Sequence, residues 1–217
     1  MFIEIIATNL QDCQIIEQAG NINRIELCRN LNQGGLTPAY DVIKETTEQI
    51  KIPIRVMVRH HTVDFYCPEA EYLQIKKDIR YIKTTKAEGI VIGILTRDHH
   101  LDLIRMQELV TLAHPLAVTF HRAFDLIDDK VTAVQQLAQL GVKTILTQGG
   151  RTPILENLTI LQELRNYGVQ IQGGRGINLT NYQKIQQYCD AIHLGSAVHK
   201  DGTWNTTIAL SKLQQLQ

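Results

Sequence analysis

The chain has 217 residues, of which 44% are hydrophobic and 20% are charged, as expected for a globular protein with a full core. Its 22 basic and 22 acidic residues give a formal net charge of zero, so charge offers no basis for binding nucleic acid or an anionic membrane surface. No apolar run approaches the roughly 20 residues that span a bilayer. The N-terminus lacks the basic segment and cleavage site of a signal peptide. We therefore expect a cytoplasmic protein.

Eight apolar, strand-like runs alternate with segments of helical periodicity along the chain. The runs are residues 2–7, 24–28, 54–59, 90–94, 117–121, 144–147, 169–172 and 191–194. In the gaps, apolar residues recur at helical spacing, as at Cys13, Ile16 and Ala19. Glycines at positions 20, 89, 141 and 168 are predicted to end helices.

This alternation predicts parallel strands joined by helical crossovers. Eight such units favour a single domain over residues 1–217, folded as a closed (β/α)8 TIM barrel. A doubly wound open sheet is the alternative, but it usually has fewer strands. Such barrels typically need about 250 residues, so the loops here must be short. The exception is residues 60–69, which follow the third run and are predicted to cover the barrel mouth as a lid.

Polar side chains interrupt the strand-like runs at positions that period-two alternation directs into the barrel. They are Glu4, Glu26, Arg59, His121 and His193. Isolated buried charges are very costly, so these groups must neutralise one another or bind a ligand. Either they form a ligand site, in which Glu4 and His193 orient or neutralise the reacting groups, or they are a structural ion-pair network.

The end of the fifth run carries a second concentration of ionisable groups. An apolar segment stops at His121, Arg122 and Asp125, just before a helix predicted from about Asp129. In α/β proteins the carboxyl ends of the strands are where chemistry usually takes place. As a functional site, the mouth would use Glu26 and His121 for proton transfer, with Arg59 or Arg122 binding an anionic substrate.

Glycines follow the last three runs. They are Gly149 and Gly150, then Gly173, Gly174 and Gly176, then Gly195, which precedes Ser196. Glycine allows backbone N–H groups to converge on an anion, and many barrels bind phosphate after their last two strands. Arg151 and Arg175 could add positive charge. The alternative is tight turns that need positive φ.

Two histidine pairs and four cysteines are candidate metal ligands. Adjacent histidines, as at His60-His61 and His99-His100, usually diverge, so solvated loop histidines are the favoured interpretation. The cysteines are widely spaced, which fits neither a disulfide scaffold nor a structural zinc site. Cys28, which closes the second run at the predicted mouth, is placed where a thiolate could bind a soft ion such as Cu(I).

Several motifs resemble those of the CutC family, which is named for copper homeostasis. They are residues 24–28 (RIELC), 34–38 (GGLTP), 89–93 with Asp98 and Asp102, 120–125 (FHRAFD), 146–150 (LTQGG) and 192–197 (IHLGSA). The resemblance runs through nearly the whole chain and implies a TIM barrel. Three features depart from the family pattern: His60-His61 follows Arg59 where a second arginine is usual, Cys67 replaces a tyrosine common in the next loop, and Arg175 stands where a small residue is usual.

Two functions follow from these observations. The resemblance implies a role in copper homeostasis with Cu(I) held by Cys28. The residues at the predicted mouth favour a barrel enzyme that acts on a small phosphorylated or carboxylated metabolite. A barrel that has lost its chemistry and serves as a binding module, and assembly as a homo-oligomer, both stay open.

Overall fold

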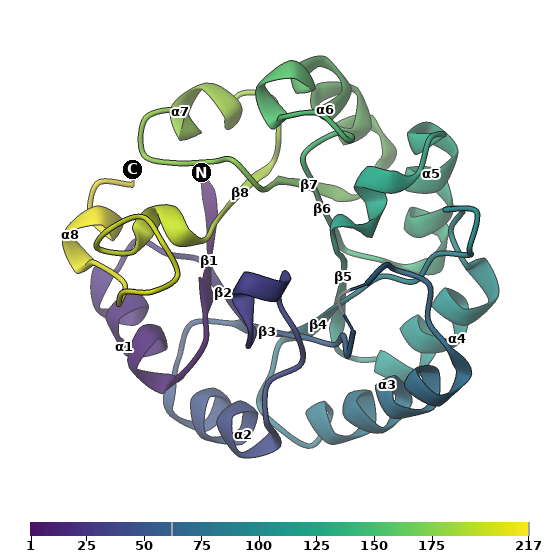
Figure 1. Cartoon of the computed structure of the whole chain (residues 1–217), viewed down its shortest axis with the longest axis horizontal. Coiled ribbons are helices and arrows are strands. Elements are labelled where there is room, and N and C mark those ends of the chain that lie inside the picture. Colours follow the sequence, from purple (N-terminus) through teal and green to yellow (C-terminus); the bar gives the residue numbers. More distant parts are fainter. Residues whose placement is uncertain (62, 217) are drawn as a thin grey trace.

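Eight parallel strands close into a barrel in the computed structural model, which describes residues 1–61 and 63–216 (Figure 1). The strands are β1 (Phe2–Ala7), β2 (Arg24–Leu27), β3 (Ile54–Met57), β4 (Gly89–Ile92), β5 (Ala117–Phe120), β6 (Thr144–Thr147), β7 (Gln170–Gly173) and β8 (Ala191–Leu194). Each strand pairs with the next, and β8 pairs with β1. The predicted (β/α)8 barrel is confirmed, and the open sheet is excluded.

The helices surround the barrel (Figure 1). They are α1 (Leu10–Ala19), α2 (Tyr40–Gln49), α3 (Glu69–Ile82), α4 (Leu103–Ala113), α5 (Lys130–Leu140), α6 (Leu158–Leu164), α7 (Tyr182–Ile185) and α8 (Leu210–Leu213). Isoleucine, leucine and valine side chains from the strands and the helices fill the layer between them. Among the described residues, no helix has the length and apolar character needed to cross a bilayer.

Local sequence signals explain where several helices begin and end. Asn9 and Asp129 cap α1 and α5, and their side chains accept hydrogen bonds from backbone N–H groups three residues ahead. Gly20 and Gly141 end the same two helices at φ values of 75° and 89°, which glycine adopts without steric cost. Gly168 likewise follows a short 3-10 helix, Arg165–Tyr167.

The prediction that Gly89 ends a helix is wrong. Helix α3 ends at Ile82, and Gly89 is the first residue of β4. A Cβ atom on Gly89 would lie 2.4 Å from the carbonyl oxygen of Ala117. This glycine therefore serves the close approach of β4 to β5, not a helix end.

Predicted and observed strand limits differ by at most two residues. Runs 2–7, 144–147 and 191–194 coincide with β1, β6 and β8. In β2, β3 and β5 the predicted run extends past the strand, so Cys28, Arg59 and His121 lie just beyond it. The backbone N–H of His121 still donates to Ile92 at 3.1 Å. However, its side chain already caps the 3-10 helix Arg122–Leu126, so the chain has begun to turn.

Alternate residues of the strands face the barrel axis, and many of them are polar. The buried polar residues at these inward positions are Glu4, Arg24, Glu26, Arg55, Thr119, Thr144, Gln172 and His193. Thr147 is also buried, but it follows the cavity residue Leu146 and points away from the axis to Asp125. The sequence neighbours of the inward residues, such as Ile3, Ile5 and Ile25, point outward and pack beneath the helices. The apolar core thus lies between strands and helices, and a polar column follows the barrel axis.

Candidate functional site

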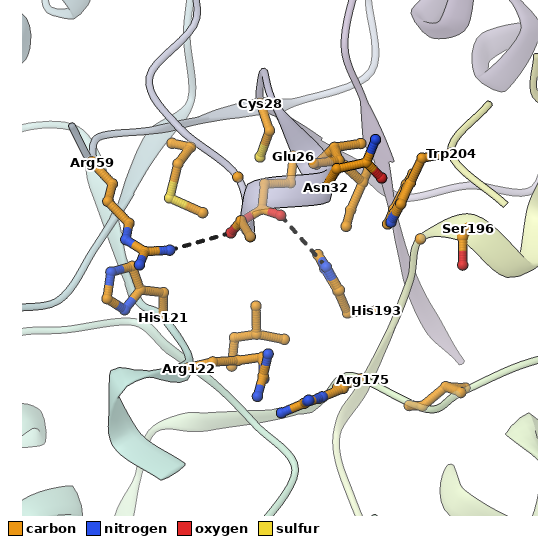
Figure 2. A pocket seen from close by; sticks show the side chains of 18 of the residues that line it. Glu26, Cys28, Asn32, Arg59, His121, Arg122, Arg175, His193, Ser196 and Trp204 are labelled. Carbon is orange, nitrogen blue, oxygen red and sulfur yellow. Dashed lines mark hydrogen bonds and ion pairs between the residues drawn. The ribbon is translucent and has the colours of Figure 1, made fainter. Parts of the chain in front are cut away.

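A cavity of about 530 Å³ opens at the carboxyl ends of the strands (Figure 2). Residues from the ends of most strands and the loops after them line it. They include Glu26, Cys28, Asn32, Met57, Arg59, Phe65, His121, Arg122, Leu146, Arg175, Gly176, His193, Gly195, Ser196 and Trp204. Its volume is within the range of small-molecule sites.

Glu26 and His193 point toward one another at the floor of the cavity (Figure 2). Glu26 Oε2 lies 3.5 Å from His193 Nε2, and both residues are buried. The other carboxylate oxygen, Glu26 Oε1, is buried and has no hydrogen-bond partner among the described residues. Buried acceptors nearly always have a hydrogen-bond partner. Glu26 Oε1 is therefore free to accept a hydrogen bond or a proton from a ligand.

Beneath this pair, Glu4 is held by hydrogen bonds from several sides. His193 Nδ1 lies 2.7 Å from Glu4 Oε1, which also accepts a 2.7 Å hydrogen bond from Gln172 Nε2. Arg24 Nε donates to Glu4 Oε2, and Arg24 Nη2 donates to Gln172 Oε1 at 3.0 Å. The four side chains come from β1, β2, β7 and β8, so the barrel must be closed for them to meet.

The pKa values of Glu26 and His193 are raised, whereas that of Glu4 is lowered. Burial raises the pKa of Glu26 from 4.5 to about 7, with only partial opposition from His193. Burial would also raise the pKa of Glu4, but Arg24 and His193 outweigh it and hold that pKa far below 4.5. Burial would lower the pKa of His193, but Glu26 and Glu4 outweigh it and raise it above 6.5. Near neutral pH, Glu26 is therefore the group poised to exchange a proton.

Three arginines place positive charge along one side of the cavity. Arg59, from the end of β3, lies 4.8 Å over the Phe65 ring, and its buried Nε has no partner among the described residues. Arg122 Nε donates to Asp125 Oδ2 at 3.0 Å. Arg175, in the loop after β7, faces Arg122 across the lower part of the mouth (Figure 2). Together these three side chains form a positively charged face of the cavity, the arginine wall.

His121 lines the cavity but is not suited to accept a proton near neutral pH. Burial, followed by the charge of Arg59, lowers the pKa of His121 from 6.5 to about 3. Its Nδ1 accepts a 3.2 Å hydrogen bond from the backbone N–H of Ala123. A Cβ atom on Gly93 would lie 2.5 Å from this ring, so that glycine makes room for it. His121 is therefore a neutral imidazole.

Asp125, the third member of the sequence cluster, does not line the cavity. Thr147 Oγ1 and the backbone N–H of Gln148 donate to its Oδ1 at 2.5 and 2.9 Å, and Arg122 donates to Oδ2. Asp125 thus ties the segment after β5 to the end of β6, and it orients Arg122.

Only some of the predicted glycine-loop residues line the cavity. Gly176, Gly195 and Ser196 line the cavity. Gly149 and Gly150 lie outside it against Asn157, and Gly149 has a φ of 88°. Among the strand-seven glycines, Gly173 packs against Cys189, whereas a Cβ atom on Gly174 would lie 2.5 Å from Leu146, a cavity residue. Arg151 points away, with Nη2 donating to the carbonyl of Leu126 at 2.7 Å.

The segment 60–69 contributes one side chain to the cavity wall. Phe65 lies 5.0 Å, between ring centroids, from His121 and contacts Arg59. At the start of the segment, His60 contacts Asp78 and His61 contacts Glu71. Thr62, within the predicted lid, lies outside the described residues.

The histidine pairs diverge. His60 and His61 bind different carboxylates on α3, and His99 and His100 are exposed. In the part of the chain that the structure describes, no three His, Cys, Asp or Glu side chains are placed to hold one metal ion. Cys28 is buried in the cavity wall beside Met57. Burial and then the charge of Glu26 raise the pKa of its thiol well above 9.

Sequence reasoning missed Trp204, Asn32 and Met57. Trp204 lies in the loop between β8 and α8, and a Cβ atom on Gly195 would lie 2.4 Å from its ring. Asn32 belongs to a 3-10 helix, Leu31–Gln33, after β2. Of the three, only Met57 carried a usable signal, because it lies two residues before Arg59 and period-two alternation gives both the same face.

Comparisons with known proteins agree with the fold and the motifs. A model of the CutC family matches residues 1–198. The chain is 36% identical over 197 residues to a CutC family protein of Proteus mirabilis, covering 89% of this chain and 79% of that protein. It is 39% identical over 178 residues to one of Pectobacterium atrosepticum, covering 81% and 71% respectively.

Solved structures lead to the same family. A CutC protein of Streptococcus agalactiae, named for copper homeostasis, matches with a TM-score of 0.82 and 32% identity, over 90% of this chain and 98% of that one. Phosphoribosyl anthranilate isomerase of Thermus thermophilus matches with a TM-score of 0.62 over 100% and 96% of the two chains, but its 14% identity shows the shared fold alone. The family model and the relatives above 30% identity show that the chain belongs to the CutC family, as its motifs predicted.

Proposed function

We propose that the chain is an enzyme that binds a small anionic metabolite at the barrel mouth and moves one of its protons through Glu26. The observation that carries this proposal is the environment of Glu26. The residue is 2% exposed, and its carboxyl group has one oxygen without a partner among the described residues and faces a cavity with three arginines. A pKa of about 7 matches a group that must both accept and return a proton near neutral pH.

The proton balance is simple. The Glu26 carboxylate takes a proton from the ligand, becomes a neutral carboxylic acid, and returns the proton to the ligand at the same or a neighbouring atom. His193 is held by Glu4, and its raised pKa favours a positive charge next to Glu26. The arginine wall would hold the anionic group of the ligand away from this carboxylate.

The test does not require the substrate to be known in advance. The protein is incubated in D2O with pools of phosphorylated and carboxylated metabolites, and mass spectrometry follows both consumption and deuterium incorporation. We expect at least one pool to be altered by the wild-type chain and left unchanged by Glu26→Gln. An exposed substitution on α2, Glu45→Gln, is the matched control and should behave as wild type. The proposal would be overturned if no pool changed at protein concentrations comparable with the ligands.

A second candidate function is Cu(I) binding, in keeping with the family name. The observation that favours it is the pairing of two sulfur side chains. A Cβ atom on Gly35 would lie 3.5 Å from the Cys28 sulfur and 3.7 Å from the Met57 methyl, so both line one patch of the cavity wall. Thiolate and thioether are ligands that Cu(I) prefers. Because the Cys28 thiol has a raised pKa, binding would have to displace its proton.

Anaerobic titration with Cu(I) against a competing chelator tests this second candidate. We expect one copper per chain, tighter binding as pH rises, and loss of binding in Cys28→Ser. Cys13→Ser is the control, because Cys13 lies outside the cavity. Copper uptake that is unchanged in Cys28→Ser would eliminate the candidate. For either function we propose a cytoplasmic location, which is supported by the four free, buried cysteines.

A further inference from the structure

The tetrapeptide Gln-Gly-Gly-Arg occurs twice, at the ends of β6 and β7. The first copy is residues 148–151 and the second is residues 172–175. The two strands are neighbours, and Leu146 pairs with Gln172 while Thr147 pairs with Gly173. The second copy therefore begins two residues closer to the barrel floor than the first.

This difference in register sends the two arginines to different places. Arg151 leaves the barrel rim, donates to the carbonyl of Leu126, lies 3.6 Å from Asp128, and is absent from the cavity lining. Arg175 lines the cavity and makes no hydrogen bond or ion pair with the rest of the described chain. Identical local sequences thus provide one arginine with partners and one without.

The backbone of Arg175 is held in a costly conformation. Its φ is 64°, in the left-handed region that favours glycine, between Gly174 and Gly176. Within the described residues, the other non-glycine residues with positive φ are Asn30 and His99, types that enter this region more readily. Local strain of this kind often marks a functional site.

Charge in this part of the cavity is not balanced by the protein. Burial lowers the pKa of Arg122, Asp125 opposes that shift, and the nearby Arg175 adds to it. Asp125 pairs with Arg122 through its Nε atom, and Arg175 has no carboxylate in ion-pair contact within the described residues. A phosphate monoester, which carries a charge of about −2 near neutral pH, would supply the negative charge that Arg175 lacks.

We propose that Arg175 and Arg122 clamp a phosphate group of the ligand between the loop after β7 and the segment after β5. This inference rests on the proposed function and narrows its substrate class to phosphorylated metabolites. Guanidinium forks recognise phosphate oxygens by paired hydrogen bonds. Figure 2 shows both side chains directed into the mouth, on the side opposite Cys28. The clamp keeps the phosphate apart from Glu26, so the reacting atoms of the ligand lie between them.

Isothermal titration calorimetry with inorganic phosphate, sulfate and acetate tests the clamp on the wild-type chain, Arg175→Gly and Arg151→Gly. Trp204 is the only tryptophan of the chain and lines the cavity, so its fluorescence reports whether an anion binds there. We expect phosphate and sulfate to bind the wild type and acetate to bind at least tenfold more weakly. Arg175→Gly should raise the phosphate Kd at least tenfold, and Arg151→Gly should leave it unchanged.

Stability provides a second readout that separates binding from folding. Glycine adopts the φ of residue 175 without strain, so Arg175→Gly should keep or exceed the wild-type Tm while losing phosphate affinity. Equal Kd values for the two glycine variants, or acetate binding as tightly as phosphate, would overturn the clamp. Those outcomes leave the proposed function standing if Glu26-dependent turnover is found. Phosphate binding without any turnover supports the clamp and counts against the enzyme.

Discussion

Glu4 and Glu26 are the same residue type on neighbouring strands, and both are buried within reach of one imidazole, yet their ionisation differs. Glu4 accepts hydrogen bonds from Arg24 and Gln172 and touches His193, so every side of its carboxylate is occupied. Glu26 has His193 at 3.5 Å and one oxygen without a partner among the described residues. The pKa of Glu4 is held far below 4.5, and that of Glu26 is raised to about 7.

The difference shows how one polar column can serve two purposes. A buried carboxylate that is fully hydrogen-bonded stabilises a fixed charge and specifies the geometry around it. A buried carboxylate with few partners has a raised pKa, because burial disfavours its charged form, so both charge states of Glu26 are accessible near neutral pH. The structural network and the candidate acid–base group that the sequence left as alternatives thus occupy successive levels of the same barrel.

The largest expected effect comes from Glu4. Glu4→Gln leaves the buried Arg24 guanidinium without its carboxylate and removes one of the two carboxylates beside His193, which should cost about 3–5 kcal/mol of unfolding free energy. Urea denaturation at neutral pH measures this cost. Glu26→Gln is the matched comparison and should cost less than about 1 kcal/mol or stabilise the chain. Equal losses from the two variants would mean that Glu26 is also a structural member of the network.

A smaller effect is expected in the pH dependence of stability. The folded pKa of Glu26 lies above its unfolded value of 4.5, so the folded chain binds more protons between pH 4.5 and about 7. The contribution of Glu26 to stability therefore falls as pH rises through that window. His193, with a raised folded pKa, adds stability that is present below 6.5 and lost at higher pH. Both contributions have the same sign.

Glu26→Gln should remove much of this pH-dependent loss of stability. The difference in unfolding free energy between wild type and variant is expected to decrease by on the order of 2–3 kcal/mol between pH 4.5 and 7.5. Denaturant titrations across this range provide the measurement, with Glu45→Gln as a control that should keep the wild-type profile. A difference that stays constant with pH would refute the raised pKa of Glu26.

The smallest expected effect is on the reactivity of Cys28. The charge of Glu26 adds to burial in raising the pKa of this thiol, so Glu26→Gln should increase the thiolate fraction and the labelling rate several-fold. Site-resolved mass spectrometry after brief alkylation at pH 8 follows the rate. Cys13, which is also buried but lies outside the cavity, is the internal reference. If the labelling rates of Cys28 and Cys13 rose together, the cause would be a general loosening of the fold.

Much of the site could be anticipated because it is carried by strand ends. Alternation within each strand directs Glu4, Glu26 and His193 to the axis, and parallel pairing brings the ends of all strands to one mouth. Loop residues follow no such periodicity. Gly176 and Gly195 line the cavity whereas Gly149 and Gly150 do not, although all four follow strands in similar sequence contexts.

The sequence by itself determined the barrel and the inward faces of its strands, because periodicity, caps and turn glycines act over a few residues. Only the tertiary structure decided which polar groups receive partners. Register placed Arg175 in the cavity and Arg151 outside it. Closure of β8 on β1 brought His193 to Glu4, 189 residues away in the chain. The pKa of a buried group depends on such neighbours and on its distance from solvent, which arise only when the whole chain has folded.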